Sequence, residues 1–292
     1  HNMKYVQVND SLENGIYLDE GLHHENMQYG FFVQPGNRLT REDSHNKVFF
    51  GSMLLLPEDA GGEVHTQVAV KSRSREDTPK LLGEMALFQH LDDLGLKTFR
   101  PAGLIVGEKA THLMTYFEGN VATMDTVDWM NMEVEEAWVE VDKVVDTMFQ
   151  LYTNALFHGD LEFRNVAFDQ TGSTVIIDPE LMISARDTYK ELLDADFILS
   201  PEQQRVYDVL VKKLSGELGS VFKSIDRHII QLMPKKERPR TDEARLKLYK
   251  KYLFEPYKSR VRELEDPMRG LLLRLVDDVM VRKKVHAKEQ IL

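Results

Sequence analysis

The residues best suited to chemistry lie in the segment His158-Gly-Asp-Leu-Glu-Phe-Arg-Asn165, and in Asp178, thirteen residues further on. The carboxylate of Asp160 is able to take the proton of an attacking hydroxyl, which is the task of a general base. Asn165 and Asp178 carry hard oxygen ligands of the kind that hold Mg²⁺ against phosphates. Phosphoryl transfer from Mg-ATP needs these residue types at this spacing. The pattern therefore predicts a phosphotransferase and leaves the phosphate acceptor open.

Lys71 and Glu84 form a second set of charged residues, thirteen positions apart. Lys71 closes the sequence Val68-Ala-Val-Lys71, which is typical of a strand. Glu84 falls on a predicted helix, on the same face as Leu81 and Phe88 at offsets of three and four residues. Because an unpaired buried carboxylate is costly, we expect Glu84 to have a cationic partner.

The first group of elements that would position these residues is mostly strand. β-Branched and aromatic residues cluster between turn signals such as Pro35-Gly36-Asn37. The predicted strands are Tyr29–Gln34, Val48–Leu56, Val64–Val70, Gly103–Gly107 and His112–Phe117. One helix interrupts them, capped by Asp77 or Thr78. Pro79 suits its first turn and Gly95 ends it.

The second group is mostly helical. A helical pattern runs from Val134 to Leu156. A short strand pair follows, Val166–Phe168 with Thr174–Ile177. The remainder is predicted to be helix, with breaks at Pro201, near Pro234–Pro239, and at Pro267 and Gly270. The chain is therefore predicted to be an α+β protein, in which a five-stranded antiparallel sheet with one helix precedes a mainly helical part.

This order of motifs resembles the protein-kinase-like superfamily from about Tyr29 to Glu180. Gly159 stands where ordinary protein kinases have arginine, so the resemblance is closest to the aminoglycoside phosphotransferase and choline kinase branch, with small atypical protein kinases next. The resemblance implies a two-lobed fold. Residues 3–117 would form a nucleotide-binding N-terminal lobe, and residues 118–292 a C-terminal lobe with the catalytic loop, the metal site and the acceptor-binding region.

The resemblance also implies a role for each matching residue. Asp160 matches the catalytic aspartate. Asn165 and Asp178 match the two positions that bind magnesium, and thereby ATP. Lys71 matches the lysine that contacts the α- and β-phosphates of ATP, and Glu84 matches the glutamate that pairs with this lysine.

Further residues match supporting positions of the same family. His158 matches a histidine that donates a hydrogen bond to the backbone, and Glu180 an acid common in the small-molecule branch. The hinge that presents backbone groups to adenine matches Met114, Thr115, Tyr116 and Phe117. No Ala-Pro-Glu sequence follows at the distance usual in protein kinases, so a long activation segment is not expected.

The chain also departs from the family pattern at two places. No Gly-x-Gly-x-x-Gly motif follows the first strand, so the phosphates need other donors, with Arg38, Arg41 and Ser44 as alternatives. Glu162 stands where protein kinases have lysine and the small-molecule branch often has histidine. Because glutamate repels phosphate, we expect another cation to compensate, with Arg164 as the candidate.

Composition narrows the remaining possibilities. The 292 residues include no cysteine, which excludes disulfides, thiolate zinc sites and cysteine nucleophiles, and fits a reducing compartment. The net charge of −11 disfavours nonspecific nucleic-acid binding, so no DNA partner is expected. The longest apolar run, Val48–Leu56, is too short to cross a bilayer, and no basic start with an apolar core marks a signal. A cytoplasmic protein without a membrane partner is therefore expected.

Charge is unevenly spread along the chain. The run from Phe117 to Asp142 holds eight acids and no Lys or Arg, and is either a solvated helix face or a site that binds a cationic acceptor. The stretch from Lys235 to Arg262 holds eleven bases and four acids, and is either solvated helix surface or a docking surface for an acidic partner or RNA.

These patterns together predict an ATP- and Mg²⁺-dependent phosphotransferase that moves the γ-phosphoryl group to a hydroxyl of a small molecule, with a cationic one favoured by the acidic run. Two alternatives remain open. One is an atypical Ser/Thr protein kinase with a protein acceptor, and the other is a kinase-like nucleotide-binding module with little turnover.

Overall fold

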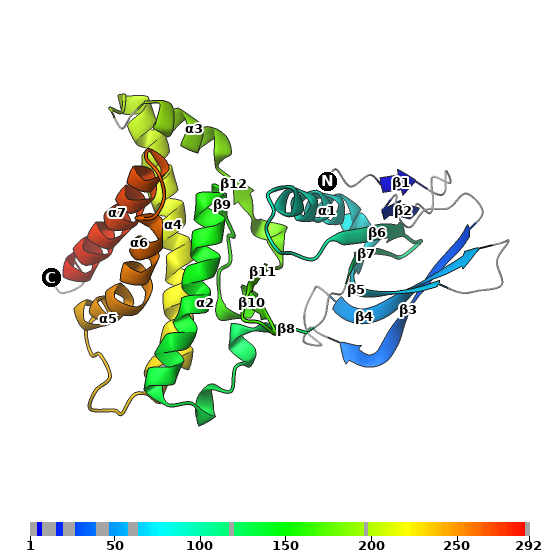
Figure 1. The fold of residues 1–292 in the computed structure, drawn as a ribbon, viewed down its shortest axis with the longest axis horizontal. Coiled ribbons are helices and arrows are strands. Elements are labelled where there is room, and N and C mark those ends of the chain that lie inside the picture. Colours follow the sequence, from blue (N-terminus) through cyan, green and yellow to red (C-terminus); the bar gives the residue numbers. More distant parts are fainter. Residues whose placement is uncertain are drawn as a thin grey trace. The chain divides into compact units, whose positions relative to one another are not determined.

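The fold is described from a computed structural model of the chain (Figure 1). Its description covers the backbone of residues 5–7, 16–19, 27–38, 47–57, 64–116, 120–195 and 198–289, and the side chains of residues 67–116, 120–195 and 198–283. The chain divides into two compact units, residues 1–119 and residues 120–292. The boundary expected from the sequence, after residue 117, falls in the segment 117–119 outside the described residues.

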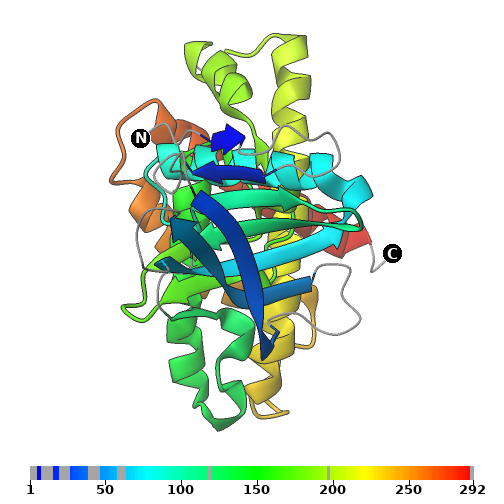
Figure 2. The ribbon, with the colours of Figure 1, turned by 90° about the vertical axis from the view of Figure 1, so that its right-hand side faces the viewer.

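The first unit is built on one antiparallel sheet, which is seen face-on in Figure 2. Its strands are β1 (Tyr5–Gln7), β2 (Ile16–Asp19), β3 (Met27–Arg38), β4 (Lys47–Pro57), β5 (Val64–Ser74), β6 (Pro101–Val106) and β7 (Ala110–Tyr116). Their order in the sheet is β1-β2-β6-β7-β5-β4-β3, so β5 is an interior strand between β7 and β4. Val68 and Val70 on β5 are fully buried, which fits the apolar pattern of this strand.

The sheet therefore has seven strands, and the prediction of five was wrong in number. The five expected strands are present as β3 to β7. The two that were missed, β1 and β2, contain three and four residues. Segments so short show too few alternations to stand out in the sequence. Lys71, expected just after a strand, lies inside β5 and pairs with Val48 and Leu113 on its two neighbours.

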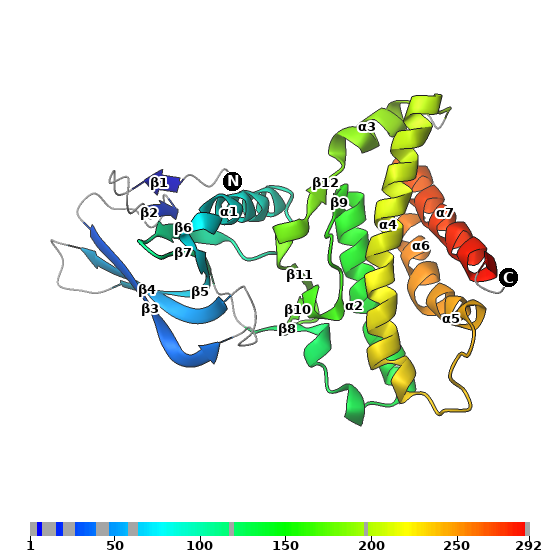
Figure 3. The same cartoon turned by 180° about the vertical axis from the view of Figure 1, so that it is seen from behind.

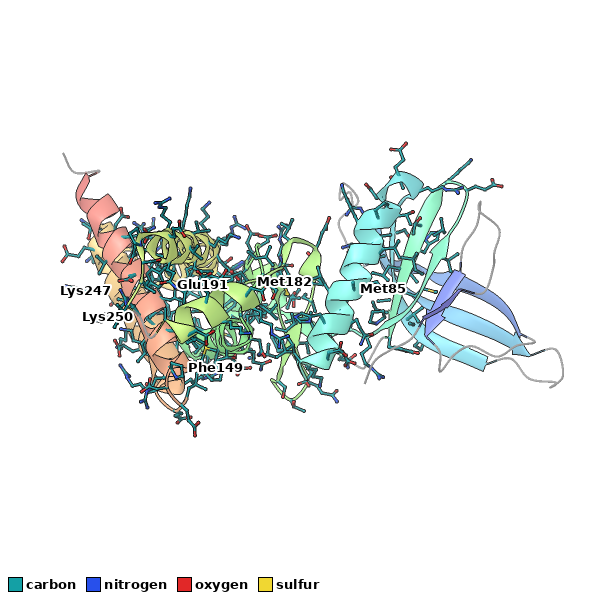
Figure 4. The ribbon with its side chains drawn as sticks, turned by 90° about the horizontal axis from the view of Figure 1, so that it is seen from above. Met85, Phe149, Met182, Glu191, Lys247 and Lys250 are labelled. Atoms are coloured by element: carbon teal, nitrogen blue, oxygen red, sulfur yellow. The ribbon has the colours of Figure 1, made fainter. Side chains whose placement is uncertain are left out.

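One helix, α1 (Thr78–Asp93), packs against β6 and β7. Figure 4 shows Met85 on the side of α1 that faces the strands, and its side chain is buried. Asp77 is the N-cap residue but makes no side-chain cap bond, because it pairs with Arg73 and Lys80 instead. Gly95 ends the helix as predicted, in the left-handed region at φ 75°.

The second unit is mainly helical, with a three-stranded and a two-stranded antiparallel sheet at one side (Figure 3). Its helices are α2 (Val134–Thr153), α3 (Arg186–Asp194), α4 (Pro201–His228), α5 (Asp242–Tyr249), α6 (Glu255–Val261) and α7 (Met268–Glu289). Its strands are β8 (Val121–Thr123), β9 (Leu156–Phe157), β10 (Val166–Asp169), β11 (Thr174–Ile176) and β12 (Ile183–Ser184). The long helix α4 packs against α7 and α3, and α2 packs against α6. The chain as described is thus a mixed α and β protein.

Aromatic stacking and one ion-pair network join the helices of the second unit. Trp138 on α2 stacks on Tyr252 with ring centroids 4.3 Å apart. Arg260 on α6 donates to Asp146 at 2.8 Å and to Asp142 at 2.9 Å, both on α2. Asp146 also accepts from Thr174 at the start of β11. Asp146 therefore links three elements that are distant in sequence, α2, α6 and β11.

The helix breaks predicted in this unit were only partly right. Pro201 begins α4 behind a Ser200 capping box, and α7 begins directly after Pro267. Gly270 does not break the chain, because it lies within the first turn of α7. A helical glycine costs only about 1 kcal/mol relative to alanine, which surrounding packing offsets. Across the ranges described above, no helix is both long enough and apolar enough to span a bilayer.

Candidate functional site

The segment 158–165 is a loop that enters from β9 and leaves into β10. β10 pairs with β11 in antiparallel register, Val166 opposite Ile176. Asn165 directly precedes β10, and Asp178 follows two residues after β11 ends. The hairpin therefore brings these two residues to the same end of the strand pair, although twelve residues separate them along the chain.

Asp160 is the centre of the hydrogen bonds in this loop. Its Oδ2 accepts from Nη2 of Arg164 at 2.7 Å and from Nδ2 of Asn165 at 3.2 Å. Nδ2 of Asn165 also donates to the backbone oxygen of Asp160 at 2.7 Å. Because the amide nitrogen of the buried Asn165 is used in this way, its amide oxygen is the atom left to bind a cation.

Arg164 lies between the two carboxylates of the loop. Its Nε is 3.2 Å from Oε2 of Glu162, while its Nη2 holds Asp160. The hydrogen bond to Asp160, together with the charges of Asp160, Glu162 and Asp178, raises the pKa of Arg164. The cation expected from the sequence to compensate for Glu162 is thus present beside it.

Asp178 has an unusual backbone conformation, with φ 48° and ψ 59° in the left-handed region. A non-glycine residue there costs on the order of 1–2 kcal/mol. The residue before it is tied to the loop, because Nε2 of His158 donates to the carbonyl of Ile177 at 2.7 Å. His158 is 1% exposed and has the structural role expected for it.

Gly159 has a conformation and surroundings that only glycine fits. Its φ is +88°, and a Cβ built on it would lie 2.5 Å from the backbone oxygen of Leu181. Leu181 is held in place because β12 pairs with β9 immediately beyond it, Ile183 opposite Phe157. The arginine that ordinary protein kinases carry here has no room in this backbone arrangement.

Glu217 on α4 is a residue of this site that the sequence analysis missed. It is 4% exposed, and its Oε1 accepts from the backbone N–H of His158 at 3.0 Å. Burial raises the pKa of Glu217 to about 7, opposed chiefly by the hydrogen bond from the backbone of His158. An inward-facing acid three residues after Leu214 on a helix was the available signal, the same one that identified Glu84.

An aromatic stack supports the other side of the loop. The ring of Phe163 lies 5.7 Å from that of Trp129 and 5.4 Å from that of His228. The Trp129 segment includes the exposed acids Asp125 and Asp128, which therefore lie next to the catalytic-loop candidate.

The acidic run as a whole is mostly exposed. Its members Glu133, Glu135 and Glu136 are exposed at the start of α2. Glu140 pairs with Lys143, and Asp142 with Arg260. Glu118 lies outside the described residues.

Some of the cations in the basic stretch Lys235–Arg262 form ion pairs. Arg260 binds Asp142 and Asp146, and Lys258 binds Asp277 on α7. The exposed cations of this stretch for which no ion pair is found within the described residues are Lys235, Lys236, Arg240, Lys247, Lys250 and Lys251. Figure 4 shows Lys247 and Lys250 beside one another at the edge of the second unit.

In the first unit, Lys71 and Glu84 form the expected pair. Nζ of Lys71 lies 2.9 Å from both carboxylate oxygens of Glu84. Lys71 is 9% and Glu84 is 3% exposed, so both charges are withdrawn from water together. Breaking such a pair from one side leaves an uncompensated buried charge, which costs about 3–5 kcal/mol.

The candidate hinge residues lie at the end of β7. Met114 is buried and stands between Val70 and Gly103, so its backbone belongs to the sheet ladder. Thr115 likewise lies between residues of the two neighbouring strands β5 and β6. The backbone N–H of Tyr116 donates to the backbone oxygen of Arg100. The backbone of these residues is therefore paired within the sheet. Phe117, and the side chains of Arg38, Arg41 and Ser44, lie outside the described residues.

Asn165 and Asp178 together match the oxygen-donor chemistry of Mg²⁺, which takes few protein ligands and keeps several waters. Within the described side chains, no group of three or more His, Asp or Glu is arranged to hold a metal.

Comparison with known proteins adds no assignment. No family model matches the chain, and no curated protein matches it significantly.

Proposed function

We propose that this protein is a two-lobed, protein-kinase-like phosphotransferase that moves the γ-phosphoryl group of ATP to a hydroxyl of a small molecule. The observation that carries the proposal is the hydrogen-bonded group of Asp160, Arg164 and Asn165, with Asp178 held at the same end of the β10–β11 hairpin. A base, a cation and two hard oxygen ligands in one small region are the parts that phosphoryl transfer requires.

Asp160 orients the acceptor hydroxyl and takes up its proton. Its Oδ1 is the oxygen that meets the acceptor, because Oδ2 already accepts from Arg164 and Asn165. Asn165 and Asp178 would hold Mg²⁺ through their side-chain oxygens. The bound ion would offset the negative charge of the phosphates.

Arg164 replaces the missing cation at position 162. Its guanidinium is planar and stays charged, and two carboxylates fix its position. In this arrangement the charge of Glu162 is neutralised by Arg164, which it also orients, so Glu162 does not repel the phosphate. The Arg164 guanidinium then stabilises charge on the transferring group.

Lys71 contacts the α- and β-phosphates, and Glu84 keeps its ammonium in place. The 2.9 Å contacts with both oxygens of Glu84 and the low exposure of both residues support this role. A buried ammonium fixed by one carboxylate acts as a positioned point charge.

The acceptor is a small molecule that carries positive charge. Asp125 and Asp128 are exposed beside the catalytic loop, through the contact of Trp129 with Phe163. Acids in that place attract cations and repel anions. The exposed cations around Lys247 and Lys250 favour the alternative, an atypical Ser/Thr protein kinase that docks an acidic protein.

The decisive experiment measures phosphate transfer from ATP with and without Mg²⁺, in the wild type and in Asp160→Asn. The variant should keep ATP affinity and fold and lose turnover by on the order of a hundredfold or more, because base and acceptor orientation are lost together. An Asp187→Asn variant removes the same charge from an exposed site in the first turn of α3, away from the catalytic loop and the acceptor region, and should keep the rate of ATP turnover. Equal rates in Asp160→Asn and the wild type would refute the assignment of the catalytic loop.

A further inference from the structure

The second unit contains a buried group of polar atoms that make no hydrogen bond within the described residues. They are Oε2 of Glu217, the hydroxyls of Tyr152 and Tyr189, and Nδ1 of His158. Each belongs to a residue at most 4% exposed. They come from α4, α2, α3 and the loop after β9. Tyr152 and Tyr189 interact with the carboxyl group of Glu217, whose Oε1 anchors the backbone N–H of His158.

These atoms are able to hydrogen-bond a carboxyl group in both its ionised and its protonated form. A tyrosine hydroxyl donates to a carboxylate and equally accepts from a carboxylic acid. Nδ1 of His158 is an acceptor in the neutral ring, because Nε2 carries the hydrogen that is donated to Ile177. The Tyr152 hydroxyl lies close enough to lower the pKa of Glu217, although the contact falls short of ordinary hydrogen-bond geometry.

We propose that Glu217, with the hydroxyls of Tyr152 and Tyr189, forms a buried proton-binding site whose occupancy sets how firmly the backbone of His158 and Gly159 is held. Glu217 is then a positioning residue for Asp160, which directly follows Gly159 in the chain. An effect of Glu217 on turnover through Asp160 rests on the proposed function, whereas proton binding and loop anchoring do not.

The burial of Glu217 favours proton uptake near neutral pH. Burial is the largest effect and raises its pKa to about 7 from an ordinary value of 4.5, and no charged side chain is among the causes. The titratable groups that face this region are Tyr152 from α2, Tyr189 from α3, Tyr257 from α6 and His158 from the loop. Burial raises the pKa of all three tyrosines, so they stay neutral.

Proton binding has two opposite effects. Because the folded-state pKa lies above the unfolded value, the native state gains stability as the pH falls from 7 towards 4.5. A neutral acid, however, accepts weaker hydrogen bonds than a carboxylate, so the loop backbone is held less firmly in the same pH range. Opposite signs for global stability and local anchoring distinguish this site from a purely structural buried residue.

The magnitudes follow from linkage. Between pH 8 and pH 5.5 the shift of Glu217 should change the unfolding equilibrium constant by about thirtyfold in favour of the folded state. Over the same range the protection of the His158 and Gly159 amides, corrected for intrinsic exchange, should fall by roughly tenfold, as a charge-assisted bond becomes a neutral one.

The experiment compares wild type, Glu217→Gln and the matched control Glu202→Gln. Glutamine keeps the acceptor for the His158 N–H and removes the titration, whereas Glu202 is exposed in the first turn of the same helix. Urea unfolding and amide exchange are measured at pH 5.5 and 8. Glu217→Gln should lose the thirtyfold pH effect and show pH-independent loop protection, and Glu202→Gln should behave as the wild type.

A second variant keeps the test valid where Glu217→Gln does not fold. Tyr152→Phe removes the hydroxyl that lowers the pKa of Glu217, so the midpoint of both pH effects should move to higher pH. Unchanged midpoints in Tyr152→Phe, or a pH effect that survives in Glu217→Gln, would overturn the proposal. If stability and exchange behave as expected but no phosphate transfer is found, the proposed function fails and the proton site stands.

Discussion

Replacement of Gly159 by alanine should destabilise the second unit far more than the same change at Gly172. Both glycines have positive φ, +88° and +81°, so both alanines meet a similar backbone cost of about 1–2 kcal/mol. A Cβ at Gly172 meets nothing within 4 Å. A Cβ at Gly159 would lie 2.5 Å from the oxygen and 2.9 Å from the Cβ of Leu181. Overpacking of this kind costs a further 1–3 kcal/mol or so, which gives about 2–5 kcal/mol in total.

The assay is urea unfolding followed by circular dichroism, with amide exchange in the second unit to separate it from the first. Adding Leu181→Ala to Gly159→Ala should not restore stability, because the closest atom is a backbone oxygen. The segment that has to move follows directly after Asp178, so metal-dependent ATP binding should weaken as well. Equal losses at the two glycines would show that Leu181 does not occupy the place described for it.

The remaining predictions concern the chemistry. Asp178→Asn should leave stability within about 0.5 kcal/mol, because asparagine tolerates the left-handed region, yet weaken Mg²⁺-dependent ATP binding in calorimetry; a metal dependence equal to that of the wild type would make Asp178 a structural acid. Arg164→Ala should cut turnover by on the order of tenfold or more with little change in unfolding free energy, since its side chain is 60% exposed; unchanged kinetics would contradict its phosphate role. Cationic hydroxyl compounds should raise the melting temperature more than neutral sugars at low salt, and Asp125→Asn with Asp128→Asn should remove the difference while ATP still binds; no preference in the wild type would favour the protein-kinase alternative. Phosphatase treatment should leave activity intact, and a loss would indicate control by phosphorylation.

Long, periodic features of the chain were predictable. The strands β3 to β7 contain enough β-branched and aromatic residues for recognition, and β1 and β2 are too short for that. One physical argument, that an acid on an apolar helix face needs a cation, predicted a cationic partner for Glu84, and the resemblance pointed to Lys71 as that partner.

Features that depend on tertiary contacts were harder to predict. Glu217, like Glu84, is a buried acid that needs a hydrogen-bonding partner. Its partner is a backbone N–H fifty-nine residues away, and a backbone group cannot be identified from the side chains in the sequence. Gly159 stood out only against the resemblance, which places arginine there in ordinary protein kinases. The structural reason for glycine is the position of Leu181, which no local sequence pattern reveals. Arg164 lies beside Glu162, as expected from the charge of that glutamate, and its role towards phosphate stays a prediction.

The network centred on Arg260 has a consequence for synthesis of the chain. Asp146 lies 114 positions before the arginine that neutralises it, and Trp138 lies a similar distance before Tyr252. On a ribosome, α2 and the β10–β11 hairpin therefore emerge long before their final neighbours and must wait with an apolar face and acids uncovered. A message that ended before codon 260 would yield a nascent chain that contains every residue of the candidate site. That chain would lack Arg260 and therefore the ion pairs that join α6 to α2.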